Sequence, residues 1–209
     1  MKSFTLATAT ATLSLFTLAS AERSNREILS EMVPNANTCD ASAPTASECA
    51  TVDQAILPIL TGFVKYKIGT PQEQAALVSW MAYESAEFKY NKNHFPAPGR
   101  PGQGCRNMMM PEFVKKYALT LPEVTSKVDV NTAAPAAILD AVNVAGLDFA
   151  AASWYYVNYC TDAQKKYLVN GGRKGWEGFV TGCVQTTMDE GRVKYWSAAA
   201  KALGLDPTK

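Results

Sequence analysis

Hydrophobic residues recur at intervals of three and four along most of the chain after position 50, which is the spacing of amphipathic helices. The first stripe consists of Val52, Ile56, Leu57, Leu60 and Val64, and its helix is expected to end near Gly69. A second helix is expected over 71–85, because Thr70 and Glu73 form a capping box. Alternation with a period of two is too brief to predict a sheet, although the loop over 88–104 could form a ribbon. The pattern predicts an all-α chain.

Further helices follow from the same periodicity and from residues that commonly cap helices. They are expected over 26–32, 111–117 and 149–159, and after Asn131, Thr161, Gly172 and Asp189. The 149–159 segment is apolar almost all round, so we expect it at the centre of the molecule. We therefore predict one domain of about seven to nine helices over 51–209, preceded by a loop-rich segment over 22–50.

The first 21 residues have the pattern of a secretory signal peptide. Lys2 is positively charged, residues 6–18 are mostly apolar or small, and Ala19-Ser20-Ala21 fits the cleavage rule. The apolar stretch is too short and too often interrupted by threonine for a membrane anchor. We expect cleavage after Ala21 and a secreted, extracellular protein that does not associate with a membrane.

The charges of the chain nearly cancel. The formal net charge is +1 at pH 7, and neither end carries a basic or acidic tail. A protein that binds nucleic acid normally presents a basic surface, so we expect no nucleic-acid partner and a monomeric protein. An enzyme that degrades anionic cell walls is often more basic than this chain.

Five cysteines in an oxidising compartment predict two disulfides and one free thiol. Cys39–Cys49 would close a turn-rich loop, and Cys160–Cys183 would join a pair of helices, which leaves Cys105 free. A catalytic thiol would need a nearby base, and the one histidine, His94, lies on a loop rich in proline and glycine. The cysteine spacing does not fit zinc either, so we predict no metal and no cofactor.

The stretch over 77–111 contains the clearest candidate for chemistry, Glu84. Leu77, Met81 and Glu84 share one face of the predicted helix, so a carboxylate ends an apolar stripe. Burial would raise the pKa of Glu84, as a general acid near neutral pH requires. A long loop over 86–104, rich in proline and glycine, follows it. The alternative is a structural glutamate paired with an arginine.

The same stretch resembles a motif of secreted fungal muramidases, which belong to the lysozyme-like superfamily with goose-type lysozymes and soluble lytic transglycosylases. The matching residues are Glu84, Ser85, Phe88, Tyr90, Asn91, Asn93, Gly102, Gly104, Arg106, Asn107, Met108 and Met109. The loop is longer than in the bacterial enzymes, and Met108 stands where they have glutamine. The resemblance implies a lysozyme-like fold and hydrolysis of the β-1,4 bonds of peptidoglycan, with Glu84 as the general acid.

On this interpretation the substrate-binding residues are Ser85, Tyr90, Asn91, Gln103, Asn107, Met108, Met109 and Tyr155. The amides and phenols among them could bind sugar hydroxyls or equally hold the backbone of their own loop. The methionines suit either the core or the floor of a cleft. Glu87 is expected to face solvent, which leaves no second carboxylate between Glu84 and Pro111.

Several alternatives to a muramidase remain open at this point. Chemistry with one carboxylate would suit a lytic transglycosylase that forms 1,6-anhydro products. The same cleft could serve a chitosanase or chitinase. The chain could also be a sugar-binding effector that has lost catalysis, because a fold does not determine a function.

Overall fold

The computed structural model describes residues 23–144 and 146–209, so the expected signal peptide over 1–21 lies outside the described residues. The described helices are α1 Asn25–Met32, α2 Val52–Lys65, α3 Pro71–Glu84, α4 Pro111–Ala118, α5 Pro122–Thr125, α6 Pro135–Val142, α7 Leu147–Tyr159, α8 Asp162–Asn170, α9 Gly172–Gly178 and α10 Glu190–Ala202. Three short segments accompany them: η1 Pro34–Asn37, η2 Ala46–Glu48 and η3 Phe179–Cys183. The described part contains no strand, only isolated bridges of Gly104 with Lys92 and Met109. The prediction of an all-α, single-domain chain is confirmed.

The described part has ten α-helices, and the nine of them that lie within 51–209 agree with the seven to nine expected there. The sequence pattern did not predict α5, a single turn opened by Pro122, because it is too short for a periodic signal. The helix expected after Asn131 begins later, at Pro135 with Ala134 as its N-cap. Asn131 instead donates its backbone N–H to Asp129 Oδ1 in the preceding turn. The other predicted helices lie within a few residues of their expected positions.

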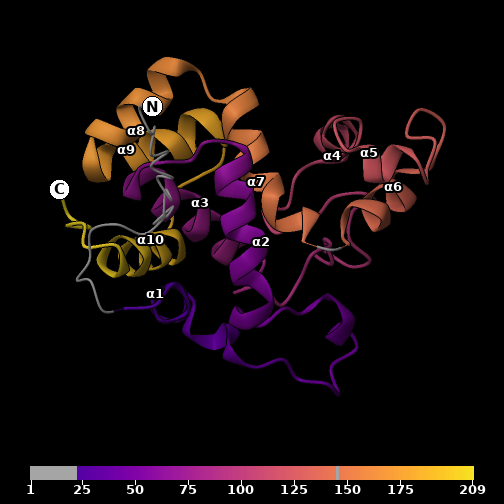
Figure 1. The fold of residues 1–209 in the computed structure, drawn as a ribbon, viewed down its shortest axis with the longest axis horizontal. Helices are drawn as coiled ribbons and strands as arrows, with labels where there is room; N and C mark the ends of the chain where they lie inside the picture. Colours follow the sequence, from indigo (N-terminus) through magenta and orange to yellow (C-terminus); the bar gives the residue numbers. More distant parts are fainter. Residues whose placement is uncertain (1–22, 145) are drawn as a thin grey trace, which may run out of the picture.

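Helix α3 lies at the centre of the fold. It begins with the predicted capping box, in which Thr70 and Glu73 exchange hydrogen bonds, and residues 74–82 are all buried. Helix α10 packs against one side of α3, and α7 and α8 pack against others. Figure 1 shows α2, α3 and α7 in the middle of the molecule, α8 to α10 on one side, and a smaller lobe of α4 to α6 on the other. The end of α3 is therefore held from several directions.

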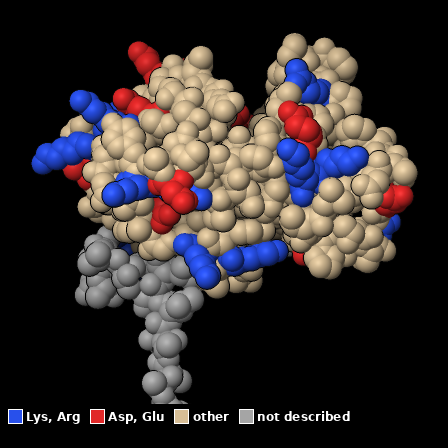
Figure 2. All heavy atoms as spheres, turned by 90° about the horizontal axis from the view of Figure 1, so that it is seen from above, with Lys and Arg blue, Asp and Glu red and all other residues tan. Residues whose placement is uncertain are grey.

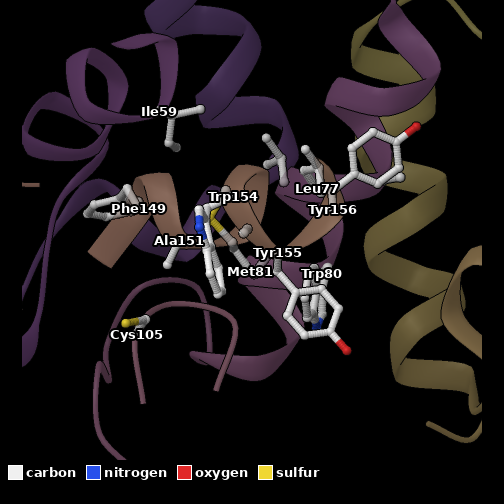
Figure 3. Close-up of a cluster of buried hydrophobic side chains, with 14 of the residues drawn as sticks. Ile59, Leu77, Trp80, Met81, Cys105, Phe149, Ala151, Trp154, Tyr155 and Tyr156 are labelled. Carbon is white, nitrogen blue, oxygen red and sulfur yellow. The ribbon is translucent and has the colours of Figure 1, made fainter. Parts of the chain in front are cut away.

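Aromatic rings form much of the core between α3 and α7 (Figure 3). Trp80 of α3 meets Tyr155 of α7 edge to face, with ring centroids 5.4 Å apart. Trp154 is also buried, as the sequence predicts for a core residue, and packs against Tyr117 of α4. These contacts join the smaller lobe to the rest of the molecule, since rings of this size bury a large apolar area.

A buried ion pair joins the loop before α4 to α7. Arg106 Nε lies 2.6 Å from Asp148 Oδ2, and both side chains are only 5% exposed. Arg106 Nη1 also donates to the carbonyl oxygens of Glu48, Phe88 and Tyr90. One guanidinium group therefore connects three segments that are far apart in the sequence.

The structure contains two disulfides, Cys39–Cys49 and Cys160–Cys183, the pairs that the sequence predicts. Cys105 is free and fully buried, and burial raises the pKa of its thiol. The two disulfides are compatible with a secreted protein. Taken singly, none of the described helices is long and apolar enough to cross a membrane, and α6 and α7, which would reach that length only together, meet at 105°.

We expect Asp148→Ala to lower the free energy of unfolding by about 3–5 kcal/mol, because it leaves the Arg106 charge buried without a counter-ion. Urea denaturation measures the change. Asp53→Ala is the control, since it breaks the exposed ion pair with Arg26 and should have little effect. Equal effects of the two substitutions would contradict a structural role for the buried pair.

Candidate active site

The candidate site is a pocket between α3, α7, α10 and the loop before α4. Its volume is about 280 Å³. The residues lining it are Trp80, Glu84, Gln103, Asn107, Met108, Met109, Met110, Phe113, Tyr155, Val184, Gln185, Thr186 and Arg192. Figure 2 shows the surface hollowed between the larger part of the molecule and a smaller lobe, with charges of both signs intermixed. The pocket brings together Glu84 and five of the predicted substrate-binding residues.

Glu84 is the last residue of α3 and reaches into this pocket, with 21% of its side chain exposed. Burial raises the pKa of Glu84, and the positive charge of Arg192 opposes that rise. Arg192 Nη2 donates to Glu84 Oε1 over 2.7 Å. The pKa of Glu84 is therefore shifted in the expected direction. The arginine partner that a purely structural glutamate would have is present as well.

Arg192 comes from α10, 108 positions beyond Glu84. The helix is capped by Asp189, which accepts the backbone N–H of Arg192. The guanidinium lies over the ring of Tyr83 at 4.0 Å from its centroid, and its Nη2 also donates to Thr186 Oγ1. Sequence reasoning missed Arg192, because nothing in its local pattern indicates which distant carboxylate it meets.

Asn107 has an unusual position in the pocket wall. Its side chain is buried, yet neither Oδ1 nor Nδ2 has a hydrogen-bond partner among the described residues. A buried amide that makes no hydrogen bond costs roughly 1–3 kcal/mol. Asn107 lines the pocket, and two other side chains of the same pocket, Trp80 at Nε1 and Arg192 at Nε, also have a buried nitrogen without a hydrogen-bond partner.

A second pocket of about 330 Å³ adjoins the first and shares Glu84, Gln103 and Met108 with it. Tyr90, predicted to bind substrate, lines this second pocket. Its other residues include the exposed side chain of Phe95. The two pockets lie on either side of these shared residues, and we call them together the Glu84 cleft.

Two residues predicted to bind substrate lie away from this cleft. Ser85 is fully buried, and its hydroxyl bonds the backbone of Met81 and Phe88 at the end of α3. Asn91 is also buried, with its backbone N–H on Glu48 and its carbonyl accepting from Asn143. Both hold the chain after α3, and neither lines the cleft.

Glu87 is also placed differently from the expectation. It is 3% exposed instead of facing solvent. It accepts hydrogen bonds from the backbone and side chain of Asn35 and from Tyr195. Since the chain leaves α3 with left-handed backbone at residues 86–88, the helical projection used for Glu87 no longer applies.

Comparison with known proteins gives one informative similarity. The chain is 31% identical over 159 residues to a protein of Fusarium oxysporum (strain Fo5176) called bifunctional dioxygenase–epoxy alcohol synthase. The aligned region covers 73% of this chain but only 12% of that protein. No family model matches the chain, and no solved structure matches it.

This similarity overturns the identification as a secreted fungal muramidase. The relative is named for dioxygenase and epoxy alcohol synthase activities, and no lysozyme family matches. The predicted glycoside hydrolase activity of a lysozyme is therefore wrong, and so are its transglycosylase, chitosanase and sugar-binding alternatives. The name of the relative points instead to an oxidoreductase. The motif misled because several of its residues, among them Ser85, Asn91 and Arg106, are buried and hold the fold.

The described residues do not fit a non-haem metal centre, which needs several His, Cys, Asp or Glu ligands. Enzymes carry out oxygen chemistry with haem, flavin, copper or non-haem iron, and the iron sites use two histidines and a carboxylate. The chain has a single histidine, His94, whose Nε2 lies 2.9 Å from Glu48 Oε1. No three His, Cys, Asp or Glu residues in the described ranges are placed to hold a metal ion. We therefore derive no redox step from this part of the chain.

We expect Arg192→Met to raise the pKa of Glu84 further, because it removes the positive charge that opposes the effect of burial. Carbon-13 NMR of the Glu84 carboxyl, followed through a pH titration, measures the change. Lys194→Met removes an exposed charge from the same helix and is the matched control. An unchanged titration in the Arg192 variant would contradict the pairing.

The raised pKa also predicts how stability depends on pH. Protonated Glu84 is favoured in the folded state, so its contribution is complete below its ordinary pKa of 4.5 and is lost as the pH rises through the folded-state value. The stability of the natural protein relative to Glu84→Gln should therefore fall as the pH rises above about 4.5. Thermal unfolding of both proteins across this range measures it, and a relative stability that rises with pH would reverse the sign.

Proposed function

We propose that this chain is a ligand-binding domain that serves an oxidoreductase, and that the Glu84 cleft binds a small amphipathic molecule with uncharged oxygens. The similarity to one region of a larger dioxygenase–epoxy alcohol synthase supports the setting. The pocket around Glu84 supports binding as the contribution of this domain. The first ligand to test is an epoxy alcohol, because the relative is named for an epoxy alcohol synthase activity.

The observation that carries this proposal is the buried amide of Asn107. An amide presents both a donor and an acceptor, so an uncharged hydroxyl or epoxide oxygen would satisfy it if the buried side chain turned into the pocket. The neighbouring wall is apolar, with Met110, Phe113 and Tyr155 around the same pocket. A cleft of this kind, mostly apolar with a few polar groups, is typical of sites for small molecules.

Glu84 supports a second candidate function, the transfer of a proton to the bound molecule. Burial raises its pKa, and the carboxyl in its protonated form can donate to an epoxide oxygen. As that oxygen takes the proton, its bond to carbon breaks and water adds to the carbon. The water then gives a proton back to Glu84, so the carboxyl is restored.

We also propose that the protein is secreted. The pattern of residues 1–21 and the two disulfides support this location. Four further points stay predictions: that the protein binds peptidoglycan, that it has no nucleic-acid or membrane partner, that it is monomeric, and that its segments are bounded at 22–50 and 51–209. The next experiment therefore includes peptidoglycan fragments as a competing ligand.

We expect Asn107→Ala to weaken binding of a medium-chain epoxy alcohol about tenfold, as the loss of one good hydrogen bond implies. Isothermal titration calorimetry measures the affinity. The variant should not be less stable than the natural protein, since the amide has no partner in the fold to lose. Asn170→Ala, at an exposed asparagine outside the cleft, is the control and should bind normally.

Two further ligands complete the comparison: soluble peptidoglycan fragments, and an alkane of the same chain length as the epoxy alcohol. Preference for the epoxy alcohol over both would support the proposal. Tighter binding of the peptidoglycan fragments would contradict it, and so would a large loss of stability in Asn107→Ala without a change in affinity.

A further inference from the structure

We infer that His94 is the base of the second pocket, where it takes a proton from the water that opens an epoxide held by Glu84, and that Glu48 positions the imidazole ring. This inference rests on the second candidate function, proton transfer by Glu84, and names the group that receives the proton of the water. It depends on the second pocket alone, which both Glu84 and His94 line.

Two groups are needed because of the direction in which an epoxide opens. In a displacement, water attacks carbon from the side opposite to the C–O bond that breaks. A carboxyl that donates to the epoxide oxygen lies on the side of the departing oxygen, so it is badly placed to hold the attacking water as well. A second side chain, with an ordinary pKa near neutral pH, is the suitable acceptor for the proton of that water.

The second pocket offers one side chain of this kind. Besides Glu84, the lining side chains that can lose a proton are Tyr83, Tyr90, Lys92 and His94. Tyrosine and lysine side chains ordinarily keep their protons near pH 7, whereas imidazole changes its charge close to that pH. His94 is therefore the lining residue best suited to accept a proton.

The imidazole of His94 is held by the carboxylate of Glu48. Its Nε2 lies 2.9 Å and 3.1 Å from the two carboxylate oxygens. Glu48 is in turn fixed by burial, with 11% of its side chain exposed, and by the backbone N–H of Asn91 that it accepts. An ionised carboxylate only accepts hydrogen bonds, so it favours the neutral tautomer with the proton on Nε2 and the lone pair on Nδ1.

The other ring nitrogen of His94 is available to a ligand. Nδ1 has no hydrogen-bond partner among the described residues, and it is not one of their enclosed unpartnered atoms. It is therefore open to solvent, in contrast to the enclosed amide of Asn107. The ring lies against Tyr90, with centroids 5.6 Å apart, and 32% of the His94 side chain is exposed. These are the properties of a base that can reach a bound water.

The alternative is that the pair of Glu48 and His94 only holds the loop. The loop has hydrogen bonds of its own, because Asn93 Nδ2 donates to the carbonyl oxygen of Phe95 and Asn93 Oδ1 accepts the backbone N–H of Arg100. These bonds do not involve the imidazole. A substitution of His94 that keeps a donor for Glu48 should therefore leave the loop in place, which allows the two roles to be separated.

The reaction balances without an oxidant or a reductant. Glu84 gives its proton to the epoxide oxygen as the C–O bond breaks. The oxygen of water forms a bond to the same carbon, and His94 Nδ1 takes one proton of that water. The product is a vicinal diol. The proton then returns from His94 to Glu84 through solvent water, so both side chains are restored.

The test follows hydrolysis of the medium-chain epoxy alcohol to a triol in water enriched in oxygen-18, with mass spectrometry as the readout. The natural protein should form a triol that carries one heavy oxygen. His94→Gln should lower kcat by about 10²–10⁴-fold, because its amide can still donate to Glu48 but is not a base. Lys89→Gln, which removes an exposed charge outside the pocket, is the control and should react normally.

The tautomer of His94 is a second, independent measurement. The chain contains one histidine, so nitrogen-15 NMR of protein without an affinity tag reports this ring directly. We expect the neutral ring to carry its proton on Nε2. Glu48→Gln should lower the share of this tautomer and lower kcat with it, whereas a role of Glu48 in folding alone would not couple the tautomer to the rate.

The outcomes separate this inference from the proposed function. Normal hydrolysis by His94→Gln, or a neutral ring with its proton on Nδ1, rejects His94 as the base. If the natural protein binds the epoxy alcohol without opening it, this inference and the second candidate function fail while the binding domain stands. If the epoxy alcohol does not bind, the proposed function itself fails. Thermal unfolding confirms the fold of each variant, and the tautomer is measured on the natural protein, whatever the variants do.

Discussion

The arrangement of the cleft depends on one buried charge, the guanidinium of Arg106. It pairs with Asp148 at the start of α7, and both side chains are almost fully buried. Its remaining donors satisfy three backbone carbonyls from the η2 region and from the chain after α3. Asn107 and Met108 follow it directly, so the wall of the cleft is positioned by the same group. A buried charge tolerates few geometries, and for this reason it specifies the loop more strictly than apolar packing would.

The helices were predictable because their signals are local. Thr70, Thr51 and Thr161 begin helices with capping boxes that can be read from four consecutive residues. Periodicity also placed Glu84 at the buried end of α3. Its partner was not predictable, because Arg192 reaches it only through the packing of α10 against α3. The burial of Glu87 was missed for a related reason, since the helix ends in left-handed turns that no periodic projection describes.

The motif between positions 84 and 109 shows how a short resemblance can mislead. Ser85 and Asn91 bond the backbone of their own region, and Gly104 lies where any side chain would meet Leu139 and the Asn91 carbonyl. Such residues are required by the shape of the loop, whatever the protein does. The motif residues that line the cleft are Glu84, Tyr90, Asn93, Asn107, Met108 and Met109. The chemistry of a site must therefore be argued from the side chains that reach it.

The Cys39–Cys49 disulfide has a consequence for how the protein matures. Cys49 directly follows Glu48, whose carboxylate holds His94 and the backbone of Asn91, and whose carbonyl accepts from Arg106. Formation of this disulfide restricts the backbone next to Glu48. Glu48 contacts both the rim of the cleft, through His94, and the buried guanidinium of Arg106. A chain that folds in a reducing compartment would lack this restraint on Glu48. Completion of the cleft is in this way tied to the redox conditions under which the chain is made.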